Sequence, residues 1–372
     1  MAVVATPFGF GPASKAYSIG RVLAEEHDMD VRYHGSGSAL DFFAAQPDTI
    51  SSPLDTTSPP VDPSIPGSAD AVINVLAPEM IPSAEIAAST YYVDSLGFMW
   101  ERADVPEDSP LTRVRAYFAQ DLFGSVANLS RLGLRRVIPV SGIVAPVPLP
   151  GAPVPGTPDR TRALVQLGGL GNPAGPESGR VYLALAERLL IALGKNSYEL
   201  EIAMNRSDDG FRLEVDAPVR HLSAEGFRIA LGGCDVVLSS PGMTTLVEVS
   251  QSRRPYVPLP PQNWSQVVIC RHMTRRSGHG IWTFLTRPYD SIDARGPEEE
   301  KAAAVREVNR QLASDTGFIR GFAEIAHEAV SDPEVPEVGN PFEGAREIAA
   351  TVARDLNVGK SPVGPRGKEG KR

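Results

Sequence analysis

The stretch CDVVLSSPGMTTLVEVSQSRRPYVPLPPQNWSQ, residues 234–266, decides the fold expected for this chain. Its first part predicts a buried strand at residues 236–238, a tight Ser-Ser-Pro-Gly turn and a helix that opens at Met243. A second short strand is predicted at residues 255–259. A strand, a glycine turn, a helix and another strand are typical of one unit of a parallel α/β sheet.

The turn at Gly242 predicts an anion site. Free N–H groups and the positive end of the helix dipole meet at a helix N-terminus, and a glycine there lets a ligand approach the backbone. Glu248 follows Thr244 by one helical turn and shares its face. We therefore expect this helix to bind a phosphate at its start and a hydroxylated group, such as a ribose, beside Glu248.

The composition limits the class of protein. The chain has 372 residues, which favours two domains, and its 42% hydrophobic and 22% charged residues are typical of a globular protein. The net charge is −9 and the only basic run is the tail at residues 360–372, which gives no support for nucleic-acid binding. With no apolar run of about 18 residues and no basic leader, we expect no membrane span, no signal peptide and a cytoplasmic location. The sequence leaves a homodimer open.

The metal-binding residue types lack a useful spacing. Cys234 and Cys270 are too few for a disulfide framework and predict buried, apolar side chains. His272 and His279 have no third ligand in a regular pattern. We therefore expect neither a metal centre nor a cofactor.

Residues 1–144 predict a first α/β domain. A glycine-rich turn joins the first strand to a helix at residues 14–26, and residues 46–68, rich in Pro, Ser and Thr, predict a loop. The predicted strands are residues 2–5, 30–33, 71–75, 89–93, 113–118 and 137–140.

A second domain is predicted at residues 161–340, after a proline-rich linker at residues 145–160. Residues 357–372 predict a disordered tail. Between these limits we expect strands at residues 162–167 and 198–204, and helices at residues 179–193, 299–329 and 341–356.

Four motifs in this order resemble the donor half of a known enzyme family: GGLGN at 168–172, VRHLS at 219–223, CDVVLSSPGMTTLVEV at 234–249 and VPLPPQNWSQ at 257–266. The order is similar to that in nucleotide-sugar glycosyltransferases of the GT-B fold, above all those that add N-acetylglucosamine to the peptidoglycan precursor and those of natural-product pathways. This resemblance implies two facing Rossmann-like domains with a cleft between them and a C-terminal helix that packs back toward the first. It also implies metal-independent, inverting sugar transfer from a nucleoside diphosphate, with UDP favoured, to a small molecule of secondary metabolism.

The resemblance implies a role for each motif. Residues 242–245 would bind the diphosphate, Glu248 the ribose hydroxyls, the amides after residue 261 the sugar or its phosphate, and residues 221–223 the nucleobase. The implied donor-binding residues are Gly168, Gly169, Gly171, Asn172, His221, Leu222, Ser240, Gly242, Met243, Thr244, Thr245, Glu248, Gln262, Asn263 and Gln266.

The first glycine loop departs from the family pattern. Many relatives carry a histidine there, whereas Ser14 and Lys15 stand at the corresponding positions of this chain. Both are candidate catalytic residues, and Lys15 can neutralise a donor phosphate. Phe10 and Gly11 are candidates for acceptor binding. The loop also resembles that of cytosylglucuronate-synthase-like enzymes of antibiotic biosynthesis, which implies UDP-glucuronic acid as a donor and cytosine as an acceptor.

Three further polar residues follow predicted strands of the first domain. Asp94 is a candidate base for the acceptor, with a helix cap or a solvated strand end as the alternative. Gln120 follows the next strand and is a candidate acceptor contact of the same kind. His34 is a candidate acceptor contact or an exposed turn residue.

Two other functions fit the same motifs. A nucleotide-sugar 2-epimerase shares the fold and the donor pocket but needs no acceptor. An inactive nucleotide-binding partner protein would explain the missing loop histidine. A redox enzyme is disfavoured, because no GxGxxG followed by an acidic residue stands after a first strand.

Overall fold

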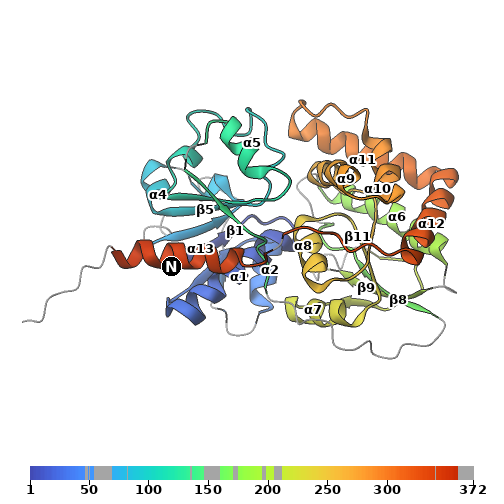
Figure 1. The fold of residues 1–372 in the computed structure, drawn as a ribbon, viewed down its shortest axis with the longest axis horizontal. Coiled ribbons are helices and arrows are strands. Elements are labelled where there is room, and N and C mark those ends of the chain that lie inside the picture. Colours follow the sequence, from blue (N-terminus) through green and yellow to red (C-terminus); the bar gives the residue numbers. More distant parts are fainter. Residues whose placement is uncertain are drawn as a thin grey trace, which may run out of the picture.

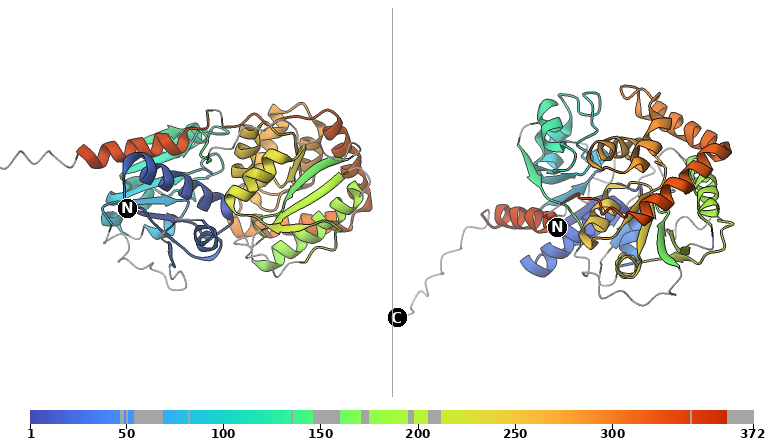
Figure 2. Two further views of the ribbon diagram at one scale, coloured as in Figure 1. Left: turned by 90° about the horizontal axis from the view of Figure 1, so that it is seen from below. Right: turned by 45° about the vertical axis from the view of Figure 1, so that its right-hand side comes forward.

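The computed structural model describes residues 1–46, 49, 51–53, 69–81, 83–134, 136–145, 160–170, 175–194, 198–204, 212–339 and 341–358. These residues form two α/β lobes, each built on one parallel sheet (Figures 1 and 2). Residues 146–159 of the expected linker and residues 359–372 of the expected tail lie outside this description.

The N-terminal lobe contains a seven-stranded sheet in the order β3-β2-β1-β4-β5-β6-β7. Its strands are β1 (Ala2–Ala5), β2 (Arg32–Gly35), β3 (Ser51–Pro53), β4 (Val72–Val75), β5 (Thr90–Asp94), β6 (Ala116–Gln120) and β7 (Val137–Val140). Its helices are α1 (Phe10–His27), α2 (Gly37–Ala44), α4 (Ala84–Ser89), α5 (Ser125–Arg131) and the last helix of the chain, α13 (Gly344–Val358), with short 3₁₀ turns at Pro78–Met80 and Pro110–Arg113.

The C-terminal lobe contains a five-stranded sheet in the order β10-β9-β8-β11-β12. Its strands are β8 (Thr161–Gln166), β9 (Tyr198–Met204), β10 (Val219–His221), β11 (Val236–Ser239) and β12 (Tyr256–Pro258). Its helices are α6 (Pro176–Leu193), α7 (Ala224–Gly233), α8 (Met243–Ser252), α9 (Trp264–Arg276), α10 (Gly280–Thr286), α11 (Glu298–Ser314) and α12 (Thr316–Ser331), with a 3₁₀ turn at Arg287–Tyr289.

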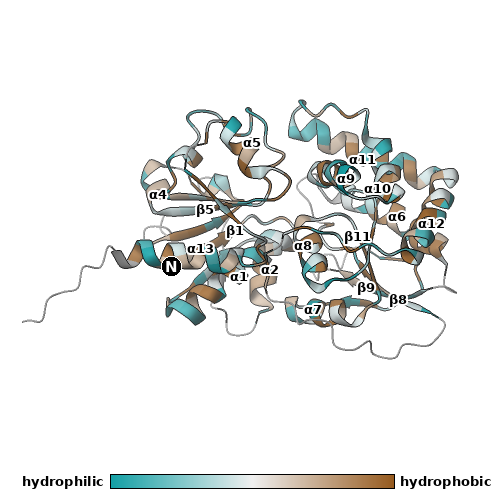
Figure 3. Ribbon diagram, in the orientation of Figure 1, coloured by the Kyte–Doolittle hydropathy of each residue, from teal (hydrophilic) through white to brown (hydrophobic). Residues whose placement is uncertain are grey.

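The central strands are mostly apolar because helices cover both faces of each sheet (Figure 3). All four residues of β1, β4 and β11 are buried. The hydrophobic core of the C-terminal lobe extends from β8 and β11 into α6, α9 and α12. Burial of this apolar surface is the main force that holds each lobe together.

Helix α13 returns to the N-terminal lobe, as expected. It packs along α1 (Figure 1), and its Ile348, Ala349 and Val352 are fully buried in the core of that lobe. Two ion pairs fix its ends: Arg346 contacts Glu26 at 2.9 Å and Asp355 contacts Arg115 at 2.7 Å. The N-terminal lobe is therefore completed by the last described residues of the chain.

The predictions for several segments differ from the structure. Strand β3 lies within residues 46–68, predicted as a loop, because Ser51–Pro53 pairs with the edge of β2. Residues 113–118 were predicted as one strand, but a 3₁₀ turn occupies Pro110–Arg113 and β6 begins later, at Ala116. The helix predicted at residues 299–329 is two helices, because Asp315 ends α11 and caps α12 by accepting the N–H groups of residues 317 and 318.

Each sheet has one point at which the strand order reverses. This point lies between β1 and β4 in the N-terminal lobe and between β8 and β11 in the C-terminal lobe. Ligands of open parallel sheets bind outside the carboxyl ends of strands at such points. Because α1 of one lobe packs against α8 of the other, the two reversal points face the same space.

Candidate active site

A cavity of about 560 Å³ lies between the lobes and receives the loops that follow β1, β4, β8 and β11. Its size is that of a small-molecule site. The sequence-predicted residues that line it are Phe10, Gly11, Ser14, Lys15, Gly168, Gly169, Leu222, Ser240, Gly242, Met243, Thr244, Thr245, Glu248, Gln262, Asn263 and Gln266. Gly171 and Asn172 lie outside the described residues.

Two helices begin at this cavity without a side-chain cap. Helices α7, α9 and α12 are each capped by a side chain that accepts a backbone N–H. By contrast, α1 begins after Gly9 and α8 after Gly242, and neither helix start has such a cap among the described residues. The first N–H groups of α8 therefore remain available to a ligand, as do those of Phe10 and Gly11 in α1, whose Pro12 has none. Both helix dipoles are positive at this end.

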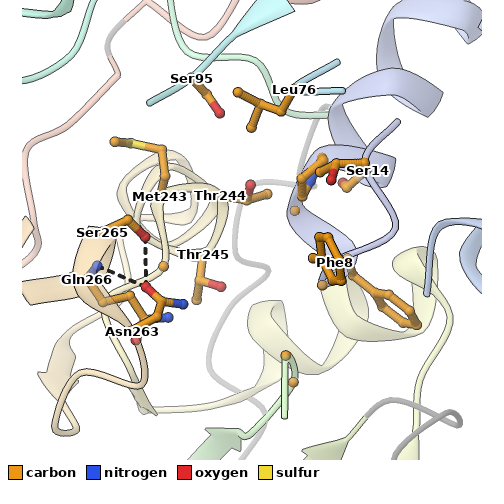
Figure 4. Close-up of a pocket in the computed structure, with 18 of the residues that line it drawn as sticks. Phe8, Ser14, Leu76, Ser95, Met243, Thr244, Thr245, Asn263, Ser265 and Gln266 are labelled. Carbon is orange, nitrogen blue, oxygen red and sulfur yellow. Dashed lines mark hydrogen bonds between the residues drawn. The ribbon is translucent and has the colours of Figure 1, made fainter. Parts of the chain in front are cut away.

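Lys15 joins the two lobes at the start of α8. Its side chain is 2% exposed and its Nζ donates a hydrogen bond to Thr244 Oγ1 across the lobe boundary. Figure 4 shows Thr244 directed toward α1, next to Ser14. Within the described part of the chain Lys15 forms no ion pair, so a buried cation faces the cavity with a neutral hydroxyl as its partner.

The close approach of α1 and α8 depends on Gly11. A Cβ atom at this residue would lie 2.9 Å from Thr244 Oγ1, closer than real Cβ contacts. Any larger residue would push the hydroxyl away from Lys15. Gly11, in the first turn of α1, therefore sets the distance between the lobes at the site.

Burial in the same part of the protein shifts the pKa values of Lys15 and Glu248. Burial lowers the pKa of Lys15 to about 8, against an opposing effect of the Glu248 charge. Burial raises the pKa of Glu248 to about 7, with the positive charge of Lys15 opposing it. Glu248 keeps some exposed area because it lines the cavity, yet protein surrounds it on most sides. An opposite pair with pKa values near neutrality is typical of a functional site.

The amide groups predicted to bind the sugar also hold the site together. Gln262 Nε2 donates to Ser240 Oγ at 3.0 Å and to Gly168 O at 3.3 Å, which joins three loops. Gln266 Oε1 accepts the Gln262 N–H at 2.7 Å. Asn263 lies at the N-cap of α9, and its Oδ1 accepts the N–H of Gln266 at 3.2 Å (Figure 4). Among the described residues, Gln262 Oε1 and Gln266 Nε2 have no hydrogen-bond partner and can therefore contact a ligand.

Asp94 does not line the cavity, contrary to the prediction that it faces the cleft. It is fully buried, and its oxygens accept hydrogen bonds from Leu96 N at 2.6 Å, Trp100 Nε1 at 2.7 Å and Tyr117 Oη at 2.5 Å. Burial raises its pKa, and the hydrogen bonds oppose that rise. Asp94 therefore holds the segment after β5 in place rather than touching a substrate.

The remaining predicted residues also lie away from the cavity lining. Gln120 is fully buried, and its Oε1 accepts the Ile143 N–H at 2.9 Å. His34 is half-buried, and burial lowers its pKa. His221 is exposed on β10, although its neighbour Leu222 does line the cavity.

Several lining residues escaped the sequence analysis. The segment after β5 contributes Leu96, Met99 and Trp100, and the segment after β4 contributes Leu76. Leu76 has φ 57°, a left-handed conformation that costs energy for a residue with a side chain. No motif marks these apolar residues, and only the position after a strand end could have suggested them.

Two features are absent from the described residues. No cluster of three His, Cys, Asp or Glu side chains is arranged to hold a metal ion in the part of the chain that the structure covers. None of the described helices is long and apolar enough to cross a membrane.

The sequence matches no family model and no curated protein. The fold does match solved structures. The S. aureus MnaA–UDP co-structure aligns over 97% of this chain and 98% of its own, with 13% identity and a TM-score of 0.51. The UDP-GlcNAc 2-epimerase of Neisseria meningitidis bound to UDP-GlcNAc aligns over 95% and 100%, with 12% identity and a TM-score of 0.51. MurG of Acinetobacter baumannii is a weaker match, over 95% and 99%, with 14% identity and a TM-score of 0.42. Identities this low show the fold alone, and the expected GT-B fold is confirmed.

Proposed function

We propose that this protein is a glycosyltransferase that moves a sugar from a nucleoside diphosphate, with UDP favoured, to a small-molecule acceptor. One observation carries the proposal: two uncapped helix starts and the buried ammonium of Lys15 meet at one cavity between the lobes. A diphosphate supplies the negative charge that this arrangement lacks.

The neighbouring groups fit the rest of a donor. Glu248 lies one turn after Thr244, where its carboxylate can accept hydrogen bonds from the two hydroxyls of a ribose. Gln262 and Gln266 line the cavity beside the helix start, where the remaining polar atoms of their side chains can contact the transferred sugar. The MnaA and Neisseria structures, which share this fold, contain UDP and UDP-GlcNAc, and this supports uracil as the base of the donor.

The proposed reaction is a single displacement. The acceptor hydroxyl or amine attacks the anomeric carbon, the bond from that carbon to the diphosphate oxygen breaks, and the diphosphate leaves with the bonding electrons. The acceptor proton passes to solvent. Negative charge grows on the leaving oxygen, where the N–H groups of α8 and the ammonium of Lys15 stabilise it without a metal. One displacement inverts the configuration of the sugar.

The test begins with UDP binding and donor kinetics of a Glu248→Gln variant. Loss of hydrogen bonds from the ribose to a charged acceptor should raise the donor KM about 10- to 100-fold. Glu225→Gln, an exposed carboxylate in the first turn of α7, is the matched control and should behave as wild type. A Glu248→Ala protein with unchanged donor KM would refute the ribose assignment. The anomeric configuration of the product, read by NMR, decides whether transfer inverts.

A nucleotide-sugar 2-epimerase is the second candidate, because the Neisseria epimerase shares the fold over its whole length. The apolar lining supplied by the N-terminal lobe favours a transferase, since an epimerase needs no second substrate. Incubation with UDP-sugars alone separates the two functions. Epimerised sugar formed without an acceptor supports the epimerase, and sugar that stays unchanged until an acceptor is added supports the transferase.

A further inference from the structure

The N-terminal half of the cavity differs sharply from the donor half in its chemistry. Around the segments that follow β4 and β5, the lining side chains are carbon-rich, and Met243 adds to them from α8. We call this group the apolar subsite, and its members are Leu76, Tyr92, Leu96, Met99, Trp100 and Met243. In Figure 4, Leu76 and Ser95 lie on one side of Thr244 and Phe8 lies on the other. The apolar subsite therefore lies next to the start of α8, on the side of Leu76.

Several polar atoms of this wall are already used inside the protein. Trp100 Nε1 donates to Asp94 Oδ2 at 2.7 Å, so the indole has only carbon to offer a ligand. The carbonyl oxygens of Gly97 and Trp100 both accept from Asn128 Nδ2, at 2.8 and 2.9 Å. The wall is therefore rigid before a ligand arrives, which lowers the entropy lost on binding.

Leu76 gives a second, independent sign of a ligand. Its φ of 57° is a conformation that L-residues avoid, and its N–H donates to Val93 O at 3.2 Å. Strained residues of this kind cluster at binding sites. Here the strained residue is one of the apolar lining residues, beside Ser95 (Figure 4).

Few polar groups remain for an acceptor. Ser14 and Ser95 line the cavity near α1 and β5, and their hydroxyls suit one small polar group. Asp104 lies at the exposed rim and its carboxylate accepts the Glu101 N–H at 2.8 Å. The subsite can thus orient one hydroxyl or amine, but it offers little to a sugar or to the polar edge of a nucleobase.

We propose that the acceptor is a planar, apolar ring compound with one nucleophilic hydroxyl or amine, bound against Trp100 and Met99 with that group turned toward the anomeric carbon. This inference rests on the proposed glycosyl transfer and names its acceptor class. Thioethers such as Met99 and Met243 adapt to flat rings, and an indole packs on them by its face. Asp94 acts here as a positioning residue, because it fixes Trp100.

The experiment measures binding and transfer separately. Calorimetry with UDP present compares 2-naphthol, methyl glucoside and cytosine, and transfer from UDP-sugars is then assayed with each compound. We expect 2-naphthol to bind at least 10-fold more tightly than the other two. Trp100→Ala should weaken 2-naphthol at least 10-fold, Trp100→Phe less than 3-fold, and neither should change UDP affinity more than 2-fold. Ile229→Ala, which removes an exposed apolar side chain outside the cavity, is the control for non-specific binding and should have no effect.

Each outcome bears on the inference. Tighter binding of methyl glucoside or cytosine, or a Trp100→Ala protein with unchanged 2-naphthol affinity, overturns the acceptor class. Loss of UDP binding together with 2-naphthol binding in Trp100→Ala indicates misfolding. Trp100→Phe then decides the outcome: a 2-naphthol affinity within 3-fold of wild type supports the inference, and a larger loss overturns it. If 2-naphthol binds through Trp100 but no UDP binds to the wild-type protein, the subsite stands and the proposed function fails.

Discussion

At the scale of single residues, the site depends on two buried charges, each of which costs free energy to remove from water. Lys15 is buried with a neutral partner, and Glu248 lies close enough to influence its pKa but forms no ion pair with it among the described residues. Ionised groups removed from water are unfavourable unless a counter-charge and hydrogen bonds satisfy them. A donor supplies both missing partners, because its phosphates give Lys15 a counter-charge and its ribose hydroxyls give Glu248 hydrogen bonds.

Proton exchange on UDP binding tests this directly. Because the pKa of free Lys15 is about 8, a fraction of the amine is neutral at pH 8.5, and a bound diphosphate should recharge it. We expect wild-type protein to take up about half a proton or more per UDP at pH 8.5, measured by calorimetry in buffers of different ionisation enthalpy. Lys15→Met should bind UDP more weakly and take up none. Equal uptake by both proteins would show that another group titrates.

Glu248 should lose a proton when UDP binds, whereas Lys15 should gain one. The pKa of Glu248 is about 7, so at pH 6.5 the carboxyl is partly protonated and must lose its proton to accept ribose hydroxyls. UDP affinity should therefore fall as the pH drops below 7. UDP itself gains a proton near pH 6, so the informative quantity is the difference between wild type and Glu248→Gln. That difference should shrink as the pH falls, and a difference that stays constant from pH 8 to 6 would contradict the assignment.

Asp94 allows a stability prediction. In Asp94→Asn an NH₂ group must replace one of the two oxygens, and both oxygens accept hydrogen bonds from buried donors. The unmatched donors should lower the free energy of unfolding by about 1–3 kcal/mol, measured with urea. Tyr117→Phe removes one donor and leaves the carboxylate with its others, so we expect about 1 kcal/mol there. The prediction fails if Asp94→Asn is as stable as wild type.

At the scale of elements, helix α13 carries the largest stability prediction. Ile348 is fully buried between α13 and the N-terminal sheet, so Ile348→Ala leaves a cavity in that core. We expect a loss of about 2–5 kcal/mol. Arg354→Ala on the exposed side of the same helix is the matched control and should change stability by less than about 0.5 kcal/mol. Equal effects of the two changes in urea unfolding would show that α13 does not complete the core.

Local patterns predicted the strands at the sheet reversal points and also β5, β7 and β9, but not β3, β10 or helix α9. The strands that become β1, β8 and β11 are apolar runs followed by glycine turns, so sequence alone located them and the start of α8. Helix α9 was missed because its buried face combines apolar residues with Gln266, and its last turn carries the charged Arg275 and Arg276. Strand β3 was missed because pairing with β2, rather than its composition, makes it a strand.

The same division applies to the site. Glu248 and Thr244 were predicted together because one helix carries both. The burial of Lys15 could not be predicted, since the residue that covers it lies 229 positions away in the other lobe. Asp94 was assigned a catalytic role because a carboxylate after a strand is ambiguous until its hydrogen-bond donors are known.

At the scale of the whole molecule, the lobes are joined by more than the linker. His272 of α9 packs against the rings of Phe98 and Phe123, with ring centroids 5.8 and 5.1 Å apart. The N–H of Gly142 donates to Gly339 O at 3.2 Å, where the chain crosses back toward α13. These contacts, with Lys15, connect the lobes on several sides of the cavity.

A chain cut within residues 146–159 should therefore stay together. The C-terminal fragment still carries α13, which is packed in the core of the N-terminal lobe. We expect one species with the mass of the whole protein in size exclusion with light scattering, and unchanged UDP binding. The control lacks residues 341–372, and its two fragments should separate after the same cut. Separation of the fragments while α13 is present would contradict this picture.

The position of α13 also affects the order of events during protein synthesis. The first 144 residues leave the ribosome early, but the core of their lobe stays open until residues 344–358 emerge. Until then the surface that later receives Ile348 and Val352 is exposed, and such surfaces favour aggregation and chaperone binding. The lobe made first thus becomes native last, and truncated products of premature termination should be recognised and degraded rather than retained as partly functional protein.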